Sequence, residues 1–172
     1  MTTKPKTSKR DRKATVKSIV PCLTFSGRTE EAVNFYTSVF KDSRIVDIVR
    51  SDSDGPIPKG KVLHAAFELN GQEYTAFDGG PSFRFSEAFS FVAPCETQDE
   101  LDEVWTRLSE GGKEGPCDWL TDRFGVSWQV IPEALGEMMT HPESGNSEAV
   151  MEALLKMGKI DIKTLKKAYK QR

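Results

Sequence analysis

Residues 21–40, PCLTFSGRTEEAVNFYTSVF, decide the fold because they place an apolar strand directly before an amphipathic helix. The strand is expected to start near Val16, and the apolar residues of the helix, such as Ala32 and Tyr36, recur at helical spacing. Thr29 is expected to cap the helix, and acidic residues in its first turn favour the positive end of the helix dipole. A strand followed by a well-marked helix therefore opens the fold.

Three β-rich segments follow this helix: RIVDIVRS (44–51), KVLHAAFELN (61–70) and QEYTAFDGG (72–80). The last two meet at Asn70-Gly71, a dipeptide typical of a two-residue hairpin turn. The first half of the chain is therefore predicted to have the order β-α-β-β-β.

The second half repeats this order. EAFSFVAPC (87–95) is a predicted strand, and TQDELDEVWTRLSEGG (97–112) is a predicted helix with a capping box between Thr97 and Glu100. KEGPCDWLT (113–121) and VSWQVIP (126–132) supply further strands. A shift of 69 residues superposes the two helices, so that Glu31 falls on Glu100. We therefore expect two similar modules that form a pseudo-symmetric fold with a shared cleft.

The composition is that of one globular unit with a charged arm and a helical tail. The chain has 172 residues, of which 37% are hydrophobic and 29% charged. We expect a basic disordered arm at 1–16, a domain at 17–132 with modules at about 17–80 and 86–132, and a helical extension at 133–172 that packs on the domain or on a dimer partner. The arm is expected to make at most non-specific contacts with nucleic acid.

Two further expectations concern the cell compartment. No segment is long and apolar enough to cross a bilayer, and the N-terminal residues have no apolar signal core, so we predict a cytoplasmic protein without a membrane partner. Cys22, Cys95 and Cys117 have no metal-site or paired spacing, and they are predicted to be buried, reduced thiols.

These segments, together with ALLKMGKIDIKTLKKAY (153–169), resemble PhnB-like proteins over about residues 17–170. That family is also labelled 3-demethylubiquinone-9 3-methyltransferase, and it belongs to the vicinal oxygen chelate superfamily of glyoxalases, bleomycin-resistance proteins and dioxygenases. The resemblance implies an α+β fold of tandem βαβββ modules around a concave cleft, usually completed in a homodimer. It also implies a metal site with ligands on the first and last strand of each module.

The chain departs from that metal site. The positions equivalent to the usual His and Glu ligands fall on Pro21, on Ser90, within 75–77 and on Gln129. Divalent ions prefer carboxylate or imidazole donors, so these residues would leave an ion underliganded. We therefore predict no cofactor. A divalent metal stays an alternative, although its standard ligands are absent.

Six residues are candidates for ligand binding. Strand alternation places His64 and Glu68 on one face, where they could form an acid/base pair or have structural roles. Gln129 is expected to point into the cleft and to orient a ligand by hydrogen bonds, as Ser90 could also do. The other candidates are Asp78, at a strand end, and Trp119, which could stack on a flat ligand.

The leading hypothesis is a homodimer that binds a small organic ligand in its clefts without the standard metal. The sequence does not identify a reaction that this ligand would undergo. One alternative is a metal-dependent lyase or isomerase of glyoxalase type that uses His64 and Glu68. The other is the methyltransferase of the family label. That alternative is disfavoured because the chain lacks the Gly-rich turn and the parallel strand order of a doubly wound methyltransferase.

Overall fold

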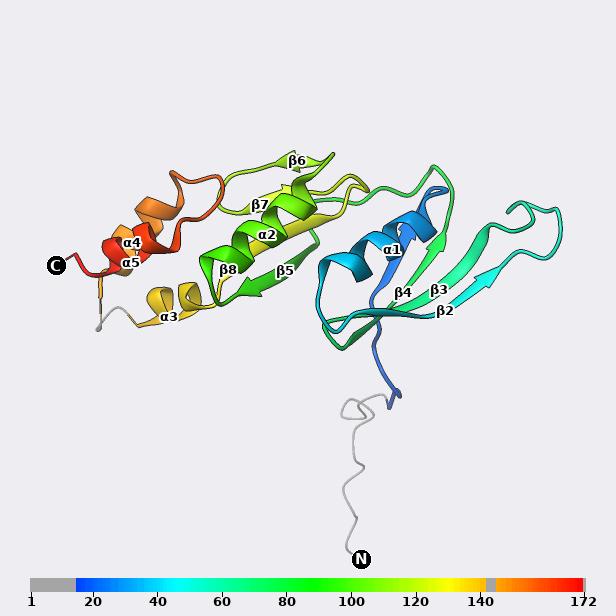
Figure 1. The fold of residues 1–172 in the computed structure, drawn as a ribbon, viewed down its shortest axis with the longest axis horizontal. Helices are drawn as coiled ribbons and strands as arrows, with labels where there is room; N and C mark the ends of the chain where they lie inside the picture. The colour runs from blue at the N-terminus through cyan, green and yellow to red at the C-terminus, as the bar shows by residue number, and fades with distance from the viewer. Residues whose placement is uncertain (1–14, 142–144, 172) are drawn as a thin grey trace, which may run out of the picture.

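The computed structural model of the chain describes residues 15–141 and 145–171. It is an elongated α+β molecule with two four-stranded sheets placed side by side and three helices at one end (Figure 1). Most of the predicted basic arm lies outside the described residues.

Each half of the domain is a βαβββ module. The first contains β1 (Cys22–Phe25), α1 (Thr29–Val39), β2 (Arg44–Arg50), β3 (Val62–Leu69) and β4 (Gln72–Asp78). The second contains β5 (Ser90–Cys95), α2 (Gln98–Ser109), β6 (Lys113–Glu114), β7 (Trp119–Thr121) and β8 (Ser127–Pro132). The strand orders β1-β4-β3-β2 and β5-β8-β7-β6 are the same, which confirms the predicted tandem repeat.

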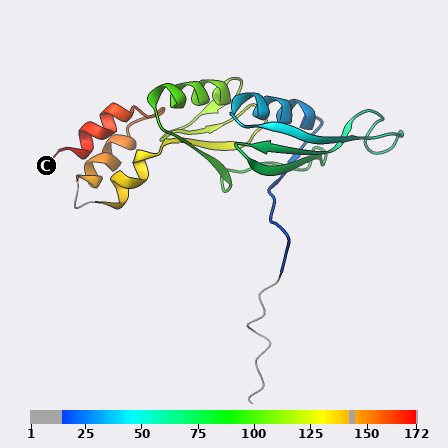
Figure 2. The same ribbon diagram turned by 60° about the horizontal axis from the view of Figure 1, so that its bottom comes forward.

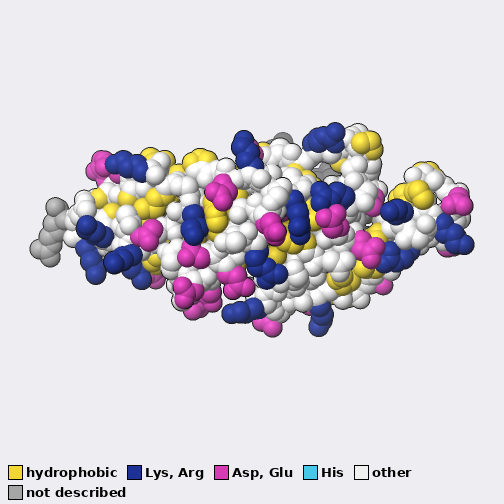
Figure 3. Space-filling model, turned by 45° about the horizontal axis from the view of Figure 1, so that its top comes forward, with side chains coloured by type: hydrophobic (Ala, Val, Ile, Leu, Met, Phe, Trp, Pro, Cys, Tyr) yellow, Lys and Arg dark blue, Asp and Glu magenta, His cyan; other side chains and the backbone are white. Residues whose placement is uncertain are grey.

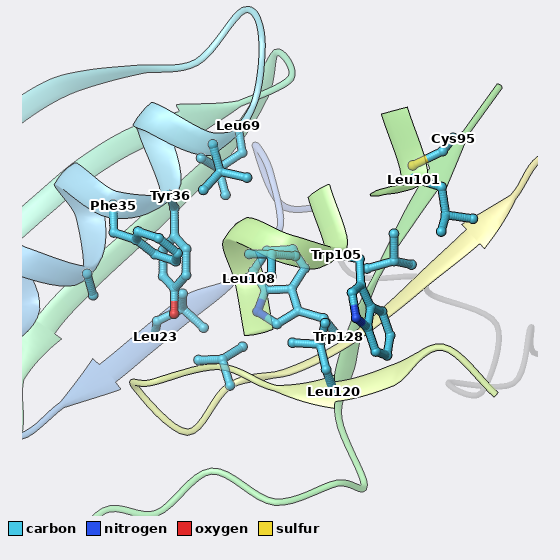
Figure 4. Packing of buried hydrophobic residues seen from close by; sticks show 14 of the residues in the cluster. Leu23, Phe35, Tyr36, Leu69, Cys95, Leu101, Trp105, Leu108, Leu120 and Trp128 are labelled. Atoms are coloured by element: carbon cyan, nitrogen blue, oxygen red, sulfur yellow. The ribbon is translucent and has the colours of Figure 1, made fainter. Parts of the chain in front are cut away.

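Both module helices lie on one side of the sheet layer, and in Figure 2 the opposite side of that layer carries no helix. The core lies between α1, α2 and the sheet face that they cover. Figure 4 shows its two ends, with Tyr36 of α1 facing Trp128 of β8, and Trp105 of α2 facing Leu120 of β7. The uncovered face of the two sheets is therefore the surface on which outward-pointing strand residues are accessible.

Helix capping differs between the two modules. Thr97 accepts a hydrogen bond from the backbone N–H of Glu100 at 3.2 Å, as predicted. Thr29, in contrast, is not the cap of α1. It is the first helical residue, and its buried hydroxyl donates to Asp78 at 2.6 Å. The hydroxyl faces the interior, where the partly buried carboxylate of Asp78 is its partner in place of the free N–H groups of its own helix.

Strand β1 is shorter than predicted. It begins at Cys22, whereas Val16 and Ile19 are 63% and 88% exposed. Thr75 still donates to the carbonyl of Pro21 at 3.0 Å, but proline has no N–H to continue the ladder. The strand therefore ends its pairing there, and Cys22 is exposed instead of buried.

The strand predicted at 113–121 is interrupted. β6 and β7 are separated by a tight loop in which Cys117 and Asp118 both have positive φ, at 54° and 57°. Cys117 is therefore a half-buried loop residue, and only Cys95 of the three thiols is fully buried. None of these three cysteines forms a disulfide, as predicted.

The C-terminal segment forms α3 (Ala134–Thr140), α4 (Ser147–Leu154) and α5 (Ile162–Tyr169), and it packs on the second module of the same chain. Asp161 caps α5 by accepting from Thr164 N–H at 2.6 Å. The segment before this helix is anchored by Asp118, which accepts from Ile160 N–H at 2.6 Å and donates its own N–H to the carbonyl of Gly158 at 2.7 Å.

Within the described part of the chain, no helix has the length and apolar character needed to cross a membrane. The face shown in Figure 3 carries acidic and basic side chains interspersed along its whole length.

Candidate functional site

The site is built on the uncovered face of the second sheet, and strand alternation selects its residues. In β8, Trp128 and Val130 are buried under the helices, whereas Gln129 between them is only partly buried. Because successive side chains of a strand point to opposite faces, Gln129 lies on the uncovered face, where the sequence predicted it.

Gln129 is held in place by Ser90. Strands β5 and β8 run parallel, with Ser90 opposite Ser127 and Val92 opposite Gln129. This offset lets the Gln129 amide nitrogen donate to the Ser90 hydroxyl at 2.8 Å. With its nitrogen engaged in this way, the Gln129 amide can accept a hydrogen bond through its oxygen, and the Ser90 hydroxyl can donate its own proton to a ligand.

Trp119 lies next to this pair. It is opposite Gln129 in the β7–β8 ladder, and it is partly buried. It lines a cavity of about 460 Å³ together with Thr121, Ser127, Lys113 and Glu87. That volume is within the range of small-molecule sites. The structure therefore brings Ser90, Gln129 and Trp119 together beside a cavity with an aromatic wall, hydroxyl groups and charges of both signs.

His64 and Glu68 lie elsewhere, on β3 of the first sheet. Glu68 forms an ion pair with Arg44 at 2.9 Å, and His64 is exposed opposite Val49. Four strand residues separate the two, so their side chains do not meet. The first module therefore offers an imidazole and a carboxylate that is bound to a guanidinium, rather than an acid/base pair.

The alternation predicted for β3 holds only for part of the strand. Ala65, Phe67 and Leu69 are buried as predicted, but Val62 is 3% exposed and Leu63 is 38% exposed, the reverse of the prediction. The register between β2 and β3 shifts at Val49/Arg50, and this irregularity exchanges the two faces.

Asp78 lies on the side of the first sheet that α1 covers, and not on the uncovered face. Its carboxylate accepts the Thr29 hydroxyl at 2.6 Å and so fastens the end of β4 to the start of α1. This contact gives Asp78 a structural role in the first module.

The residues at the superfamily's metal positions do not fit a divalent ion. In the segment 75–77, Thr75 and Phe77 are on the uncovered face, while Ala76 is fully buried. With Pro21, Ser90 and Gln129, the available donors are hydroxyl and amide groups, with neither carboxylate nor imidazole. Among residues 15–141 and 145–171, no group of three or more His, Cys, Asp or Glu side chains could hold a metal ion.

Two buried aspartates that the sequence did not suggest as important organise the second module. Asp122 accepts hydrogen bonds from Tyr36 Oη at 2.8 Å, from Trp128 Nε1 at 2.9 Å, and from two N–H groups of its own turn. Asp118 anchors the C-terminal segment, and burial raises the pKa of its carboxyl to about 7. The partner of Asp122 on α1, Tyr36, is distant in sequence, so no local pattern could indicate this contact.

Comparison with known proteins agrees with this architecture. The sequence profile of the 3-demethylubiquinone-9 3-methyltransferase family matches residues 17–131. A PhnB protein from Bacillus cereus with the same designation is 41% identical, with a TM-score of 0.63 over 67% of this chain and 99% of its own. Protein PA1353 from Pseudomonas aeruginosa is 26% identical, with a TM-score of 0.56 over 69% of this chain and 98% of its own.

A structure with much lower sequence identity has a similar fold. The fosfomycin resistance protein FosX from Listeria monocytogenes is 12% identical, with a TM-score of 0.50 over 66% of this chain and 89% of its own. No curated protein matches the sequence. The fold is thus like that of FosX, and the family profile and the Bacillus cereus structure show that the chain belongs to the 3-demethylubiquinone-9 3-methyltransferase (PhnB-like) family.

Proposed function

We propose that this protein binds a small organic ligand at the Ser90–Gln129 face of its second module, without the divalent metal of related glyoxalases. The observation that carries the proposal is the 2.8 Å hydrogen bond between Gln129 and Ser90 beside the cavity at Trp119. The pair occupies the strand positions where the superfamily places metal ligands. An amide and a hydroxyl at these positions hold a ligand directly through hydrogen bonds.

The chemistry of this face favours a flat, polar molecule. Trp119 offers an aromatic surface for stacking, Thr121 and Ser127 offer hydroxyl groups, and Lys113 and Glu87 offer charges at the edge of the cavity. None of the groups at the Ser90–Gln129 pair is a proton shuttle near neutral pH. The proposal therefore assigns binding and orientation to this pair, and it names no bond that is made or broken.

The experiment is a ligand screen with a matched pair of variants. Small aromatic and carboxylic metabolites would be tested by thermal shift, and each hit would be measured by calorimetry against wild type, Gln129→Ala and Gln98→Ala. Gln98 is a control because its amide binds the backbone of Ile160 and Ile162, far from this face. Loss of affinity in Gln129→Ala alone is expected, and equal affinity in all three proteins would refute the site.

We also propose that the working form is a homodimer, since the sheet face that carries the site has no helix over it (Figure 2). Apolar side chains lie on or next to this face, and they include Val49 at 44% and Val92 at 51% exposure. A second copy would cover these residues and close the ligand site.

The methyltransferase of the family label makes a different demand, because it requires a site for a methyl donor. Calorimetry with S-adenosylmethionine separates the two proposals. Saturable binding in the micromolar range would favour the methyltransferase, whereas the ligand-binding proposal predicts no measurable heat of binding.

A further inference from the structure

A second cavity, of about 530 Å³, lies between the two modules and shares no lining residue with the cavity at Trp119. It exists because β1 is short. This strand pairs only with Thr75–Asp78 of β4, so the first residues of β4, Gln72–Tyr74, line an opening together with β5. The end of α1 and the first half of α2 complete its walls.

Four aromatic rings from four different segments line this cavity: Phe40, Tyr74, Phe91 and Trp128. They form a continuous row, with centroid distances of 5.4 Å from Phe40 to Trp128, 5.0 Å from Trp128 to Phe91, and 5.5 Å from Phe91 to Tyr74. Three of the rings are only partly buried, so their surfaces are accessible from the cavity. Aromatic faces of this kind attract a cation through the negative charge of their π-systems.

The rim of the cavity is acidic. Four glutamates and one lysine, Lys41, line it, for a formal charge of −3. Glu100 is 3.8 Å from Lys41, and Glu103 is 3.8 Å from Arg107 of its own helix. The other two, Glu96 and Glu133, form no ion pair within residues 15–141 and 145–171.

The thiol of Cys95 also lines the cavity, and nearby carboxylates contribute to the shift of its pKa. Burial, together with the smaller effects of the carboxylates of Glu100, Asp118 and Glu133, raises its pKa to about 11. The carboxylate part of this shift has the sign that favours a cation at the same place.

From this combination of rings and rim charges we propose that the cavity between the modules binds a small organic cation, such as a quaternary or tertiary ammonium group. The aromatic row would contact its alkyl groups, and Glu96 and Glu133 would balance its charge. The site goes beyond the ligand face at Gln129, because the two cavities share no lining residue.

The test uses choline and its uncharged isostere, 3,3-dimethyl-1-butanol, as probes of the full-length protein, followed by NMR of its backbone amides. Choline is expected to shift the amides of Phe91 and Glu96 but not that of Trp119, and to bind about tenfold more tightly than the isostere. Equal binding of the two probes, or no shift at the cavity with either, would overturn the proposal.

Two variants with matched controls separate the ring and charge contributions. Phe91→Leu keeps an apolar wall but removes a ring, and Phe89→Leu is its control on a neighbouring ring outside the cavity lining. Glu133→Gln removes a rim charge, and Glu110→Gln does the same at an exposed residue outside that lining. Each variant, but not its control, is expected to weaken choline binding several-fold and to leave binding of the isostere unchanged. Should Phe91→Leu fail to fold, the Glu133→Gln pair decides the outcome.

Discussion

The Gln129 amide has two different hydrogen-bonding groups, a nitrogen that donates and an oxygen that accepts. Its amide nitrogen is used by Ser90, so its oxygen is the group that it offers to a ligand. The residue is partly buried and its side chain bonds to Ser90, whereas its neighbour Trp128 bonds to buried Asp122. The proposed binding residue and a core residue are therefore adjacent on one strand and point to opposite faces.

Replacing Gln129 with Ala should weaken ligand binding while the fold stays intact. Loss of one neutral hydrogen bond to a ligand corresponds to about 0.5–1.5 kcal/mol, or up to roughly tenfold in affinity. Calorimetry with a hit from the ligand screen measures the affinity, and thermal denaturation measures the fold. A lowered melting temperature with unaltered affinity would show that the residue is structural.

Asp118 is a residue whose charge is costly to the folded chain. It is fully buried, and within the described residues its Oδ2 has no hydrogen-bond partner. Burial raises its pKa from 3.8 to about 7, against the smaller opposite effects of the Ile160 N–H and of Lys159. The folded state thus holds a proton that the unfolded state has already released between these two pH values.

The stability of the protein should therefore fall as pH rises from about 4 to 7 through this group, with a slope that approaches ~1.4 kcal/mol per pH unit. Asp118→Asn keeps an oxygen for Ile160 N–H but has no charge, so this part of the slope should disappear. Urea denaturation of both proteins across this pH range measures it. Parallel pH profiles for wild type and variant would show that the carboxyl does not hold the proton.

Helix α2 buries an apolar stripe against the second sheet. Trp105 belongs to its apolar stripe and is 4% exposed, and its indole N–H reaches Glu114 of β6 at 3.3 Å. The residue thus joins the helix to an edge strand as well as to the core.

Trp105→Ala should lower the free energy of unfolding by about 3–5 kcal/mol, because it leaves a large cavity under α2. Chemical denaturation followed by circular dichroism is the measurement. Thr106→Ala, at an exposed position on the same helix, is the control and should have little effect. A midpoint for Trp105→Ala within error of wild type would contradict this packing.

One buried hydrogen bond between the modules comes from α1. Tyr36 is fully buried, and its hydroxyl donates to Asp122 of the second module at 2.8 Å. Removing the hydroxyl by Tyr36→Phe should cost about 1–3 kcal/mol, since it leaves a buried carboxylate oxygen with one donor fewer. Urea unfolding measures the cost, and an unchanged stability would mean that water replaces the hydroxyl.

How far the sequence predicts these elements depends on how local their causes are. The two module helices, the cap at Thr97 and the Asn70-Gly71 turn depend on neighbours along the chain, and the structure confirms them. The end of β1 and the irregularity at Val62 depend on partner strands, so periodicity alone did not locate them.

In the candidate site, too, features with local causes were predictable and features that depend on distant residues were not. Alternation along one strand sufficed to indicate the face of Gln129, whereas its hydrogen bond to Ser90 depends on the parallel pairing of β5 with β8, which the sequence analysis did not predict. Asp78 could not be placed, because its partner Thr29 comes from a helix distant in sequence. The cavity between the modules was also beyond the sequence, since residues of two sheets and two helices line it.

At the scale of the whole molecule, the uncovered sheet face predicts self-association. Val92→Lys places a charge on this face of β5 and should shift a dimer towards folded monomer. Thr106→Lys, at an exposed position of helix α2, is the matched control and should leave the dimer unchanged. Sedimentation velocity measures both, and a monomeric wild type would contradict the proposed assembly.

The claim that joins these scales is that the ligand face works without a divalent metal, and one measurement tests it most directly. Purified full-length protein would be assayed for metal content by plasma mass spectrometry, together with thermal shifts in chelator and in added manganese, nickel, zinc and magnesium. A metal that binds the native state raises the melting temperature with its concentration. We predict no stoichiometric metal and no shift. A stoichiometric metal with a chelator-sensitive melting temperature would contradict the account.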